Sequence, residues 1–317
     1  MTNKLVRSIG HARFPLAKPT WPASLPRPAP KRRVGLDYDT AWARRYPARL
    51  VRAAVTDFIS NPLTQLVAPS TIVGADSLVR LEGPLIFAAN HNSHFDTAVL
   101  LSAIPAKFRH RLIVAAASDY FFDTTAKSTV VSLVLGAIPI ERSKVSRRSA
   151  HAALELLEDG WSVLIYPEGG RSSDGWLQEF KGGAAYLSVR TGAPVIPIWL
   201  EGTGRLLPKA PTAKGSAPGG SGSESSRTAT LRRRPVSVTF GQPVRPNEGD
   251  DARKMGVRIE DAVALLGREV ATDYYQARRE PDRALTYGPE ASTWRRAWAK
   301  PPAISVAERH PRDSWPD

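Results

Sequence analysis

The 317-residue sequence contains no cysteine, so disulfide bonds, thiolate metal ligands and a cysteine nucleophile are excluded. It also lacks a long hydrophobic run. The longest mainly apolar stretch, residues 130–140 (VVSLVLGAIPI), is too short to span a bilayer as a helix. The basic N-terminus has no apolar segment of the kind that secretory signals carry. We therefore expect a cytoplasmic protein without a transmembrane helix.

Acidic residues are scarce at the start of the chain. Residues 1–55 contain 12 Lys and Arg but only two Asp, which accounts for +10 of the formal net charge of +14. Such a segment suits anionic lipid or nucleic acid as partners, and it also fits a solvated, disordered tail. The sequence has no zinc finger, aromatic RNA-binding signature or basic zipper. We therefore expect an anionic membrane surface as partner and no nucleic acid.

Composition divides the chain into three parts. Residues 1–40, rich in proline and basic residues, are predicted to be a disordered arm. Residues 41–282 are predicted to form the folded domain, with a flexible Gly/Ser/Pro-rich loop at 211–230 inside it, and residues 283–317 form a C-terminal tail. Within the domain, residues 41–59 are typical of an amphipathic helix with arginines beside apolar residues. That pattern fits either an interfacial membrane helix or a helix that caps the core.

From residue 84 onward, apolar strand patterns alternate with helical patterns. Strands are expected at 84–90, 111–118, 136–141, 161–167, 194–200 and 235–241. Helices are expected at 96–104, 120–135, 147–159, 182–192 and 249–279. The alternation predicts an α/β fold: a single domain with a largely parallel central sheet flanked by helices, plus the N-terminal amphipathic helix and flexible termini.

Residues 90–96 (NHNSHFD) lie between a predicted strand and a predicted helix. Catalytic groups are often found where a strand meets a loop at the carboxyl end of a sheet. Asp96 can turn back to accept a hydrogen bond from His91, which would fix the ring tautomer and leave the other nitrogen as a base. Asp96 could equally be a helix N-cap. A zinc site is disfavoured, because His91 and His94 lack the i, i+4 spacing and no cysteine is available, so we expect no metal.

Three further stretches follow or form predicted strands. Residues 166–175 (YPEGGRSSDG) place Glu168, two glycines and Arg171 in one loop. Glycine allows close backbone approach to a ligand and arginine offers a forked phosphate donor, although a plain glycine-rich turn has the same pattern. Residues 136–142 (GAIPIER) place Arg142 directly after a short strand. Residues 193–202 (APVIPIWLEG) are interpreted as a strand of the core.

Together, these four blocks resemble the glycerolipid acyltransferase family, of the lysophosphatidic acid (1-acylglycerol-3-phosphate) acyltransferase type. The family's N-H-x-S-x-x-D block is matched by Asn90, His91, Ser93 and Asp96, and its G-x-[IV]-x-[IV]-x-R block by Gly136, Ile138, Ile140 and Arg142. Its [FY]-P-E-G-T-R-S block is matched by Tyr166, Pro167, Glu168, Gly169, Arg171 and Ser172, and its V-[IV]-P-[IV] strand by Val195, Ile196, Pro197 and Ile198. The Phe180-Lys181-Gly182 that usually follows the third block is also present, and the resemblance covers roughly 70 to 245. One position departs from the pattern: Gly170 stands where the family usually has threonine, which puts acceptor recognition in doubt.

The resemblance implies a reaction and a set of site residues. A fatty acyl group would pass from acyl-CoA or acyl carrier protein to the hydroxyl of lysophosphatidic acid, giving phosphatidic acid, with no cofactor beyond the thioester co-substrate. His91 would be the general base and Asp96 its orienting partner. The substrate-binding residues would be Arg142, Glu168, Gly169, Arg171 and Ser172. The protein would act as a peripheral protein on the cytoplasmic face of the membrane. Another lysophospholipid or a glycolipid as acceptor stays open, as does, in a different class, a non-catalytic membrane-binding protein.

Overall fold

The computed structural model of the chain describes residues 34–141, 147–172, 176–206 and 233–271. The loop 211–230, the tail 283–317 and most of the basic arm lie outside these residues, so the expectations about them stay predictions. Residues 34–40 differ from the disorder expected of the arm, because Gly35 starts a 3-10 turn and donates its N–H to the carbonyl of Phe122 at 2.7 Å. Tyr38 then packs on the Phe122 ring and hydrogen-bonds to Thr129.

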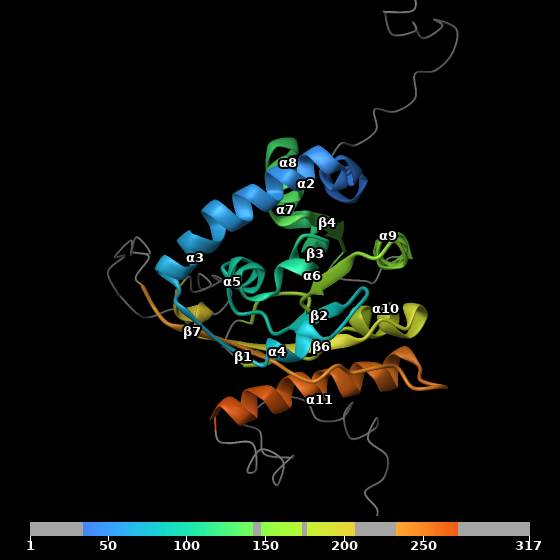
Figure 1. Cartoon of the computed structure of the whole chain (residues 1–317). Helices are drawn as coiled ribbons and strands as arrows, with labels where there is room; N and C mark the ends of the chain where they lie inside the picture. Colours follow the sequence, from blue (N-terminus) through green and yellow to red (C-terminus); the bar gives the residue numbers. More distant parts are fainter. Residues whose placement is uncertain (1–33, 142–146, 173–175, 207–232, 272–317) are drawn as a thin grey trace, which may run out of the picture. The chain divides into compact units, whose positions relative to one another are not determined.

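The centre of the fold is a sheet whose strands, in the described residues, run in the order β1-β7-β6-β2-β5-β3-β4 (Figure 1). The strands are β1 (Ser70–Val73), β2 (Ile86–Ala89), β3 (Leu112–Ala117), β4 (Ala137–Ile140), β5 (Ser162–Ile165), β6 (Val195–Glu201) and β7 (Val236–Phe240). Neighbouring strands are parallel except β6 and β7, which pair antiparallel. The predicted α/β class with a largely parallel sheet is therefore confirmed. The short strand β1 was not predicted.

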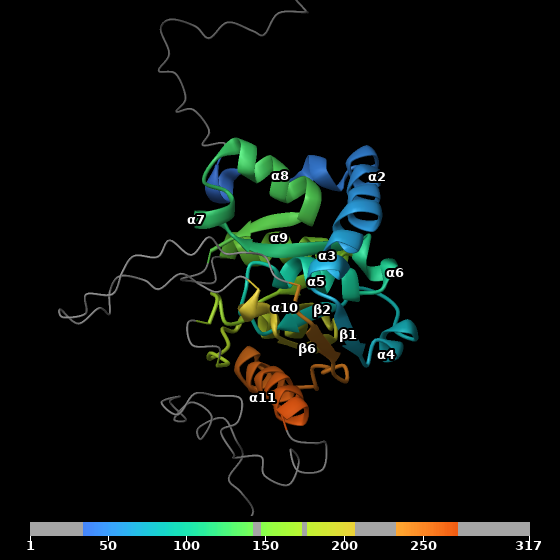
Figure 2. The same ribbon diagram turned by 90° about the vertical axis from the view of Figure 1, so that its left-hand side faces the viewer.

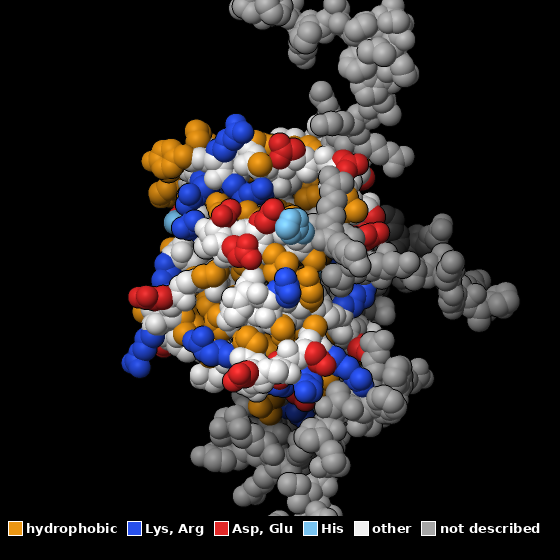
Figure 3. All heavy atoms as spheres, turned by 90° about the vertical axis from the view of Figure 1, so that its right-hand side faces the viewer, with side chains coloured by type: hydrophobic (Ala, Val, Ile, Leu, Met, Phe, Trp, Pro, Cys, Tyr) orange, Lys and Arg blue, Asp and Glu red, His pale blue; other side chains and the backbone are white. Residues whose placement is uncertain are grey.

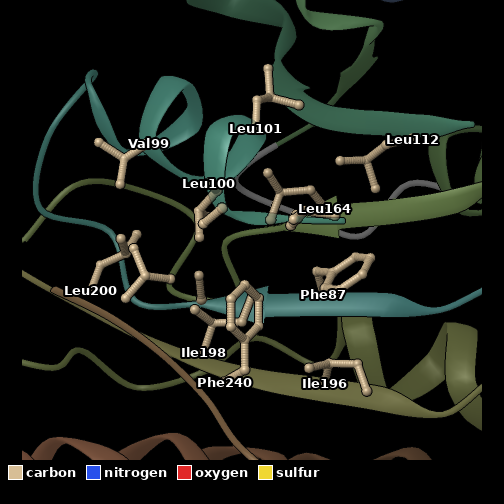
Figure 4. Packing of buried hydrophobic residues seen from close by; sticks show 14 of the residues in the cluster. Phe87, Val99, Leu100, Leu101, Leu112, Leu164, Ile196, Ile198, Leu200 and Phe240 are labelled. Carbon is tan, nitrogen blue, oxygen red and sulfur yellow. The ribbon is translucent and has the colours of Figure 1, made fainter. Parts of the chain in front are cut away.

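The central strands β2, β3, β5 and β6 are largely buried on both faces, as the strands of parallel sheets usually are. Side chains alternate along β2, so that Phe87 packs with Leu100 on one face while Ile86 packs with Val163 on the other. Figure 4 shows the first of these clusters, beneath α5 (Asp96–Ala103). The helices α9 (Arg147–Glu158), α10 (Gly183–Thr191) and α11 (Ala252–Ala271) cover the opposite face (Figure 1). Burying each large apolar side chain contributes roughly 1.5–3 kcal/mol, so this two-sided core holds the strand ends in fixed positions.

The helix predicted at 120–135 is divided in the structure. A single turn, α7 (Ser118–Phe121), is followed by a break and then by α8 (Thr125–Leu135). The break has two causes. Phe122 leaves the helical path and is fully buried in the core, and Thr124 caps α8 by accepting a hydrogen bond from the N–H of Lys127. The smaller helices α4 (Asp76–Val79) and α6 (Ala106–Arg109) lie near the start of the sheet's strands and were not predicted.

The helix predicted at 41–59 is present with different boundaries. A separate 3-10 turn (Ala41–Arg44) precedes α2 (Tyr46–Val55), which continues through a π-helical turn (Thr56–Ser60) into α3 (Asn61–Val67). The proline in the first turn of α2 is tolerated because the N–H groups there have no helical partner. Figure 2 shows α2 beside α8, with which it makes contact.

The two interpretations of this helical segment, an interfacial membrane helix and a helix that caps the core, differ in which side chains should be exposed. Its apolar side chains face outward: Phe58 is 81% exposed and Leu50 is 52% exposed. Arg52, in contrast, is only 6% exposed and faces the protein. A helix that only capped the core would show the reverse arrangement, so the exposure of these side chains disfavours the core-capping interpretation, and the membrane interpretation stays a prediction. None of the helices in the described part of the chain combines the length and the apolar composition that a bilayer-spanning helix needs.

Candidate active site

The first site block begins directly after β2, at the carboxyl end of the sheet. Asn90 is fixed there by a reciprocal pair of hydrogen bonds with β6: its side-chain amide donates to the carbonyl of Leu200 at 2.9 Å, and its Oδ1 accepts from the N–H of Leu200 at 2.7 Å. The side chain thereby extends the pairing of β2 with β6 by one position. Because Asn90 is buried, this pairing fixes the point from which the loop carrying His91 departs.

His91 and Asp96 form the predicted hydrogen bond. The ring Nδ1 of His91 lies 2.8 Å from Oδ2 of Asp96, and the aspartate is fully buried. A carboxylate accepts but does not donate, so Nδ1 carries the proton and the lone pair lies on Nε2. The same Oδ2 also accepts from the N–H groups of Asn92 and Ser93, at 2.8 and 2.9 Å. Asp96 is the first residue of α5 but makes no capping bond to it, so its carboxylate closes the preceding loop around His91 and is not an N-cap.

The imidazole of His91 rests on a tyrosine from the third block. The ring of Tyr166 stacks on that of His91, with centroids 4.1 Å apart and an angle of 21° between the planes. The Tyr166 hydroxyl is hydrogen-bonded to Oγ1 of Thr97 at 2.9 Å. Burial, with a further contribution from the negative charge of Asp96, raises the pKa of Tyr166 well above its usual value. The phenol therefore stays neutral, and the stacked ring limits rotation of the imidazole.

The first and third blocks are also joined through the backbone. Glu168 is buried, and its Oε1 accepts from the N–H of His91 at 2.7 Å while its Oε2 accepts from the N–H of Gln178 at 3.2 Å. At the next peptide unit, the N–H of Ser172 donates to the carbonyl of His91 at 2.8 Å. Glu168 and Ser172 thus hold the loop that carries His91, the candidate base, through the main-chain N–H and carbonyl groups of that residue. The substrate-binding roles expected of Glu168 and Ser172 stay predictions.

A cavity of about 200 Å³ opens beside His91. Its inner wall is apolar and is formed by side chains of β3, α8, α9, β5 and α10, among them Val114, Leu135, Ala153, Val163 and Leu187. Its polar wall contains His91, His94, Gly169, Gly170 and the two cations Arg171 and Lys181, with one acidic residue, Glu141. The candidate base therefore lies where an apolar space meets a cationic rim. That arrangement suits a substrate with a long apolar part and a negatively charged head.

Comparisons with known proteins identify relatives of this chain. A family model described as Acyltransferase matches residues 70–201. The chain carries an acyltransferase domain. A chloroplastic 1-acyl-sn-glycerol-3-phosphate acyltransferase of Brassica napus is 31% identical over 145 residues, covering 43% of this chain and 38% of the relative. A 1-acyl-sn-glycerol-3-phosphate acyltransferase of Chlamydomonas reinhardtii is 32% identical over 186 residues, covering 57% and 48% of the two chains. The match therefore spans less than half the length of these relatives.

The fold of the acyltransferase domain is shared with a solved structure. The crystal structure of the 1-acyl-sn-glycerophosphate (LPA) acyltransferase PlsC from Thermotoga maritima superposes with a TM-score of 0.51 at 21% identity. It covers 74% of this chain and 84% of the other. At that identity the likeness concerns the fold alone.

The remaining predicted residues of the acyltransferase domain lie in the cavity wall, outside the described residues, or in the buried core. Gly169 and Arg171 line the cavity, as does Glu141, whereas Arg142 itself lies outside the described residues. Gly169 has φ +71°, and a Cβ there would lie 2.5 Å from Nζ of Lys181, so only glycine fits beneath that lysine. The fourth block forms β6 and is buried core, as interpreted.

Three contributors were not predicted as site residues. Asn90, Tyr166 and Lys181 stand inside or just after the matched blocks, but spacing alone cannot show that they pair with β6, stack on the imidazole or cover Gly169. His94 lies on the cavity wall and stacks on Tyr120, with centroids 5.0 Å apart. His94 therefore lies on the cavity side of the loop and is not part of the His91–Asp96 pair.

Proposed function

We propose that this protein is an O-acyltransferase that moves a fatty acyl group from acyl-CoA or acyl carrier protein to the hydroxyl of lysophosphatidic acid, giving phosphatidic acid. The observation that carries the proposal is the His91–Asp96 pair, 2.8 Å apart, at the junction of an apolar cavity and a cationic rim. The relatives named for 1-acyl-sn-glycerol-3-phosphate support the choice of acceptor.

The chemical step uses His91 as a general base. An alcohol is a weak nucleophile, so Nε2 of His91 takes the hydroxyl proton as the oxygen attacks the thioester carbonyl. The new C–O bond and the loss of the carbonyl π bond give a tetrahedral oxyanion. When this collapses, the C–S bond breaks and the imidazolium returns its proton to the thiolate. The products are an ester and a free thiol, and no covalent enzyme intermediate is required.

Asp96 and Tyr166 support that step from the side away from the acceptor. The hydrogen bond from Nδ1 to Asp96 keeps the lone pair on Nε2 and stabilises the imidazolium that forms. Because Asp96 also holds two backbone N–H groups, the carboxylate has a fixed position and does not need to reorient during the reaction. The stacked Tyr166 ring keeps the plane of the imidazole constant.

The two substrates would use different parts of the cavity. The fatty acyl chain fits the apolar wall between β3, β5 and the helices α9 and α10. The phosphate of the acceptor would lie at the rim, where Arg171 and Lys181 bring positive charge and Gly169 allows the backbone to come close. Arg142 would join this group, since Glu141 lines the same cavity.

Gly170 favours one alternative acceptor. A Cβ at this position would meet nothing within 4 Å, so the wall is open where the family pattern has a threonine. The extra space and the lost hydroxyl fit an acceptor with a larger head, such as another lysophospholipid or a glycolipid. The chemistry at His91 would be the same.

Both substrates are amphiphiles, so the enzyme needs to dock on a membrane. We assign the docking surface to the outward face of α2 and α3, where apolar side chains are exposed: Tyr46, Leu50, Phe58, Ile59, Leu63 and Leu66. Transfer of one such large side chain out of water contributes roughly 1.5–3 kcal/mol, so a few suffice for reversible binding. On the face drawn in Figure 3, Lys and Arg are instead interspersed with Asp and Glu. The protein would bind as a peripheral protein to an anionic surface.

A panel of acceptors tests the proposed reaction. Purified protein is mixed with one acyl-CoA and, separately, with lysophosphatidic acid, lysophosphatidylcholine, lysophosphatidylglycerol and a glycolipid with a free hydroxyl, and the products are identified by mass spectrometry. The proposal predicts phosphatidic acid as the main product. A preferred product from another acceptor supports the alternative at Gly170, and the absence of any ester product contradicts the assigned chemistry.

A further inference from the structure

Another polar cavity lies beneath α2. It is next to Leu112, the first residue of β3, and therefore at the opposite end of that strand from the active site. It is lined by Arg49 and Arg52 of α2, by Arg109 and His110, and by apolar residues that include Leu112. Its volume is about 10 Å³, close to that of one water-sized probe. The mechanism described above uses none of these side chains.

Three arginines around this cavity have buried N–H groups without a hydrogen-bond partner. They are Nε of Arg49, both Nη atoms of Arg52 and Nε of Arg109. Arg52 as a whole is only 6% exposed. A buried N–H left without an acceptor costs roughly 1–3 kcal/mol, and more when the group is charged. The guanidinium groups of Arg49 and Arg52 lie over the ring of Trp161, with Cζ 5.2 and 5.8 Å from its centroid, but a ring face does not satisfy several N–H donors. Several such donors on residues that line one cavity therefore indicate that something accepts from them.

The acidic residues nearby do not supply that acceptor. Asp57 is engaged by Nη2 of Arg109 at 2.8 Å and by Nε2 of His110 at 3.0 Å. Burial, followed by the positive charges of Arg49 and Arg44, lowers the pKa of Arg52 to about 10. The guanidinium of Arg52 is therefore in a region of excess positive charge.

The surrounding backbone leaves room for this guanidinium. Gly136, at the end of α8, has φ +64°, and a Cβ there would lie 2.6 Å from Nη1 of Arg52 and 2.9 Å from the carbonyl of Leu112. Any larger residue would displace the guanidinium. The glycine therefore allows Arg52 to lie beneath α2, beside the cavity.

We propose that Arg49, Arg52 and Arg109 bind a single small monovalent anion of the halide class, such as chloride. The positive charge of the arginines and the small volume of the cavity both determine which ligand fits. A water molecule accepts about two hydrogen bonds and must place its own two protons, and most of the lining side chains are cationic or apolar and cannot accept them. The hydroxyl of Thr56, which also lines the cavity, can accept one, so the choice of an anion rests on the excess positive charge of the arginines. A phosphate has five heavy atoms and does not fit a space of one water molecule. The anion would join α2, which carries the exposed apolar face, to the last residue of α6.

The primary test is anomalous diffraction from crystals of the full chain grown or soaked in sodium bromide. The proposal predicts a bromide peak between the guanidinium groups of Arg49, Arg52 and Arg109. Density there without an anomalous signal, at bromide concentrations that label other sites, would show water and overturn the proposal. This measurement requires no variant, so a folding failure cannot obscure it.

A thermal-shift experiment tests the same site in solution. The melting temperature is compared in sodium chloride and in sodium gluconate at equal ionic strength, because gluconate screens charges equally but is too large for the cavity. At chloride ten times above its Kd, we expect a rise of about 3–6 °C. Arg52→Met and Arg49→Met should each abolish this difference, whereas Arg80→Met, at an exposed position, should retain it. Equal melting temperatures of the wild-type protein in both salts would contradict the proposal.

Discussion

Replacement of Glu168 separates two roles for this carboxylate. The family pattern assigns it to substrate binding, but in the structure its two oxygens accept from the N–H of His91 at 2.7 Å and from the N–H of Gln178 at 3.2 Å. Glu168 is also 7% exposed, so little of it is available to a ligand. These contacts indicate that it positions the backbone of His91. The two roles predict different kinetics.

The size of the effect follows from the contacts. Glu168→Ala leaves two backbone N–H groups without an acceptor, each costing roughly 1–3 kcal/mol, so we expect a loss of about 2–6 kcal/mol in the free energy of unfolding. It also releases His91 from one of its two main-chain contacts. A displacement of about 1 Å of a catalytic group lowers the rate roughly 100-fold, which is the fall in kcat that we expect.

The assay is steady-state acyl transfer with lysophosphatidic acid as the varied substrate. A positioning role predicts a large fall in kcat with little change in KM for the acceptor, and partial recovery in Glu168→Gln, which keeps one carbonyl oxygen for the N–H of His91. Glu158→Ala, at an exposed carboxylate on α9, serves as control and should behave like wild type. An unchanged kcat with a strongly raised KM for lysophosphatidic acid would refute the positioning role and restore acceptor binding.

Three further substitutions test other parts of the account. Phe58→Asp, at an 81% exposed position, should leave the melting temperature unchanged but reduce co-sedimentation with anionic liposomes several-fold, whereas Tyr186→Asp on α10 should not; equal binding by both contradicts the docking surface. In Gly170→Thr, the new side chain has open space around it, so the free energy of unfolding should change by less than about 0.5 kcal/mol. A larger loss in a denaturant titration would show that other atoms of the protein fill this space. Ala153→Leu should shift the preference in an acyl-CoA series toward shorter chains, because Ala153 lines the apolar wall; an unchanged preference places the acyl chain elsewhere.

Much of the sheet could be predicted from local patterns. The strand β2 and the helix α5 lie within one or two residues of their expected bounds, because their apolar runs are bounded by turn residues and both are buried. The strand β1 could not be predicted. Ser70–Val73 is short and largely exposed, and it is specified by pairing with Val236–Thr239, far away in the sequence.

The site shows a similar division between local and distant information. The pairing of His91 with Asp96 follows from five-residue spacing and was predicted. The contact of Glu168 with the N–H of His91 joins residues 77 apart, and no local pattern reports it. Arg52 is the clearest failure of local reasoning. Arginines on an amphipathic helix are expected to face water, yet the space left by the missing side chain of Gly136 and the ring of Trp161, whose centroid lies 5.8 Å from Cζ of Arg52, accommodate this one inside.

The assignment of His91 as general base is tested most directly by His91→Ala in acyl transfer from acyl-CoA to lysophosphatidic acid. His151→Ala is the matched control, because that side chain is 73% exposed on α9. We predict that His91→Ala lowers kcat by about 100- to 10,000-fold while His151→Ala has no effect. If His91→Ala, correctly folded, forms phosphatidic acid at a rate close to wild type, His91 is not the base and the proposed mechanism is wrong.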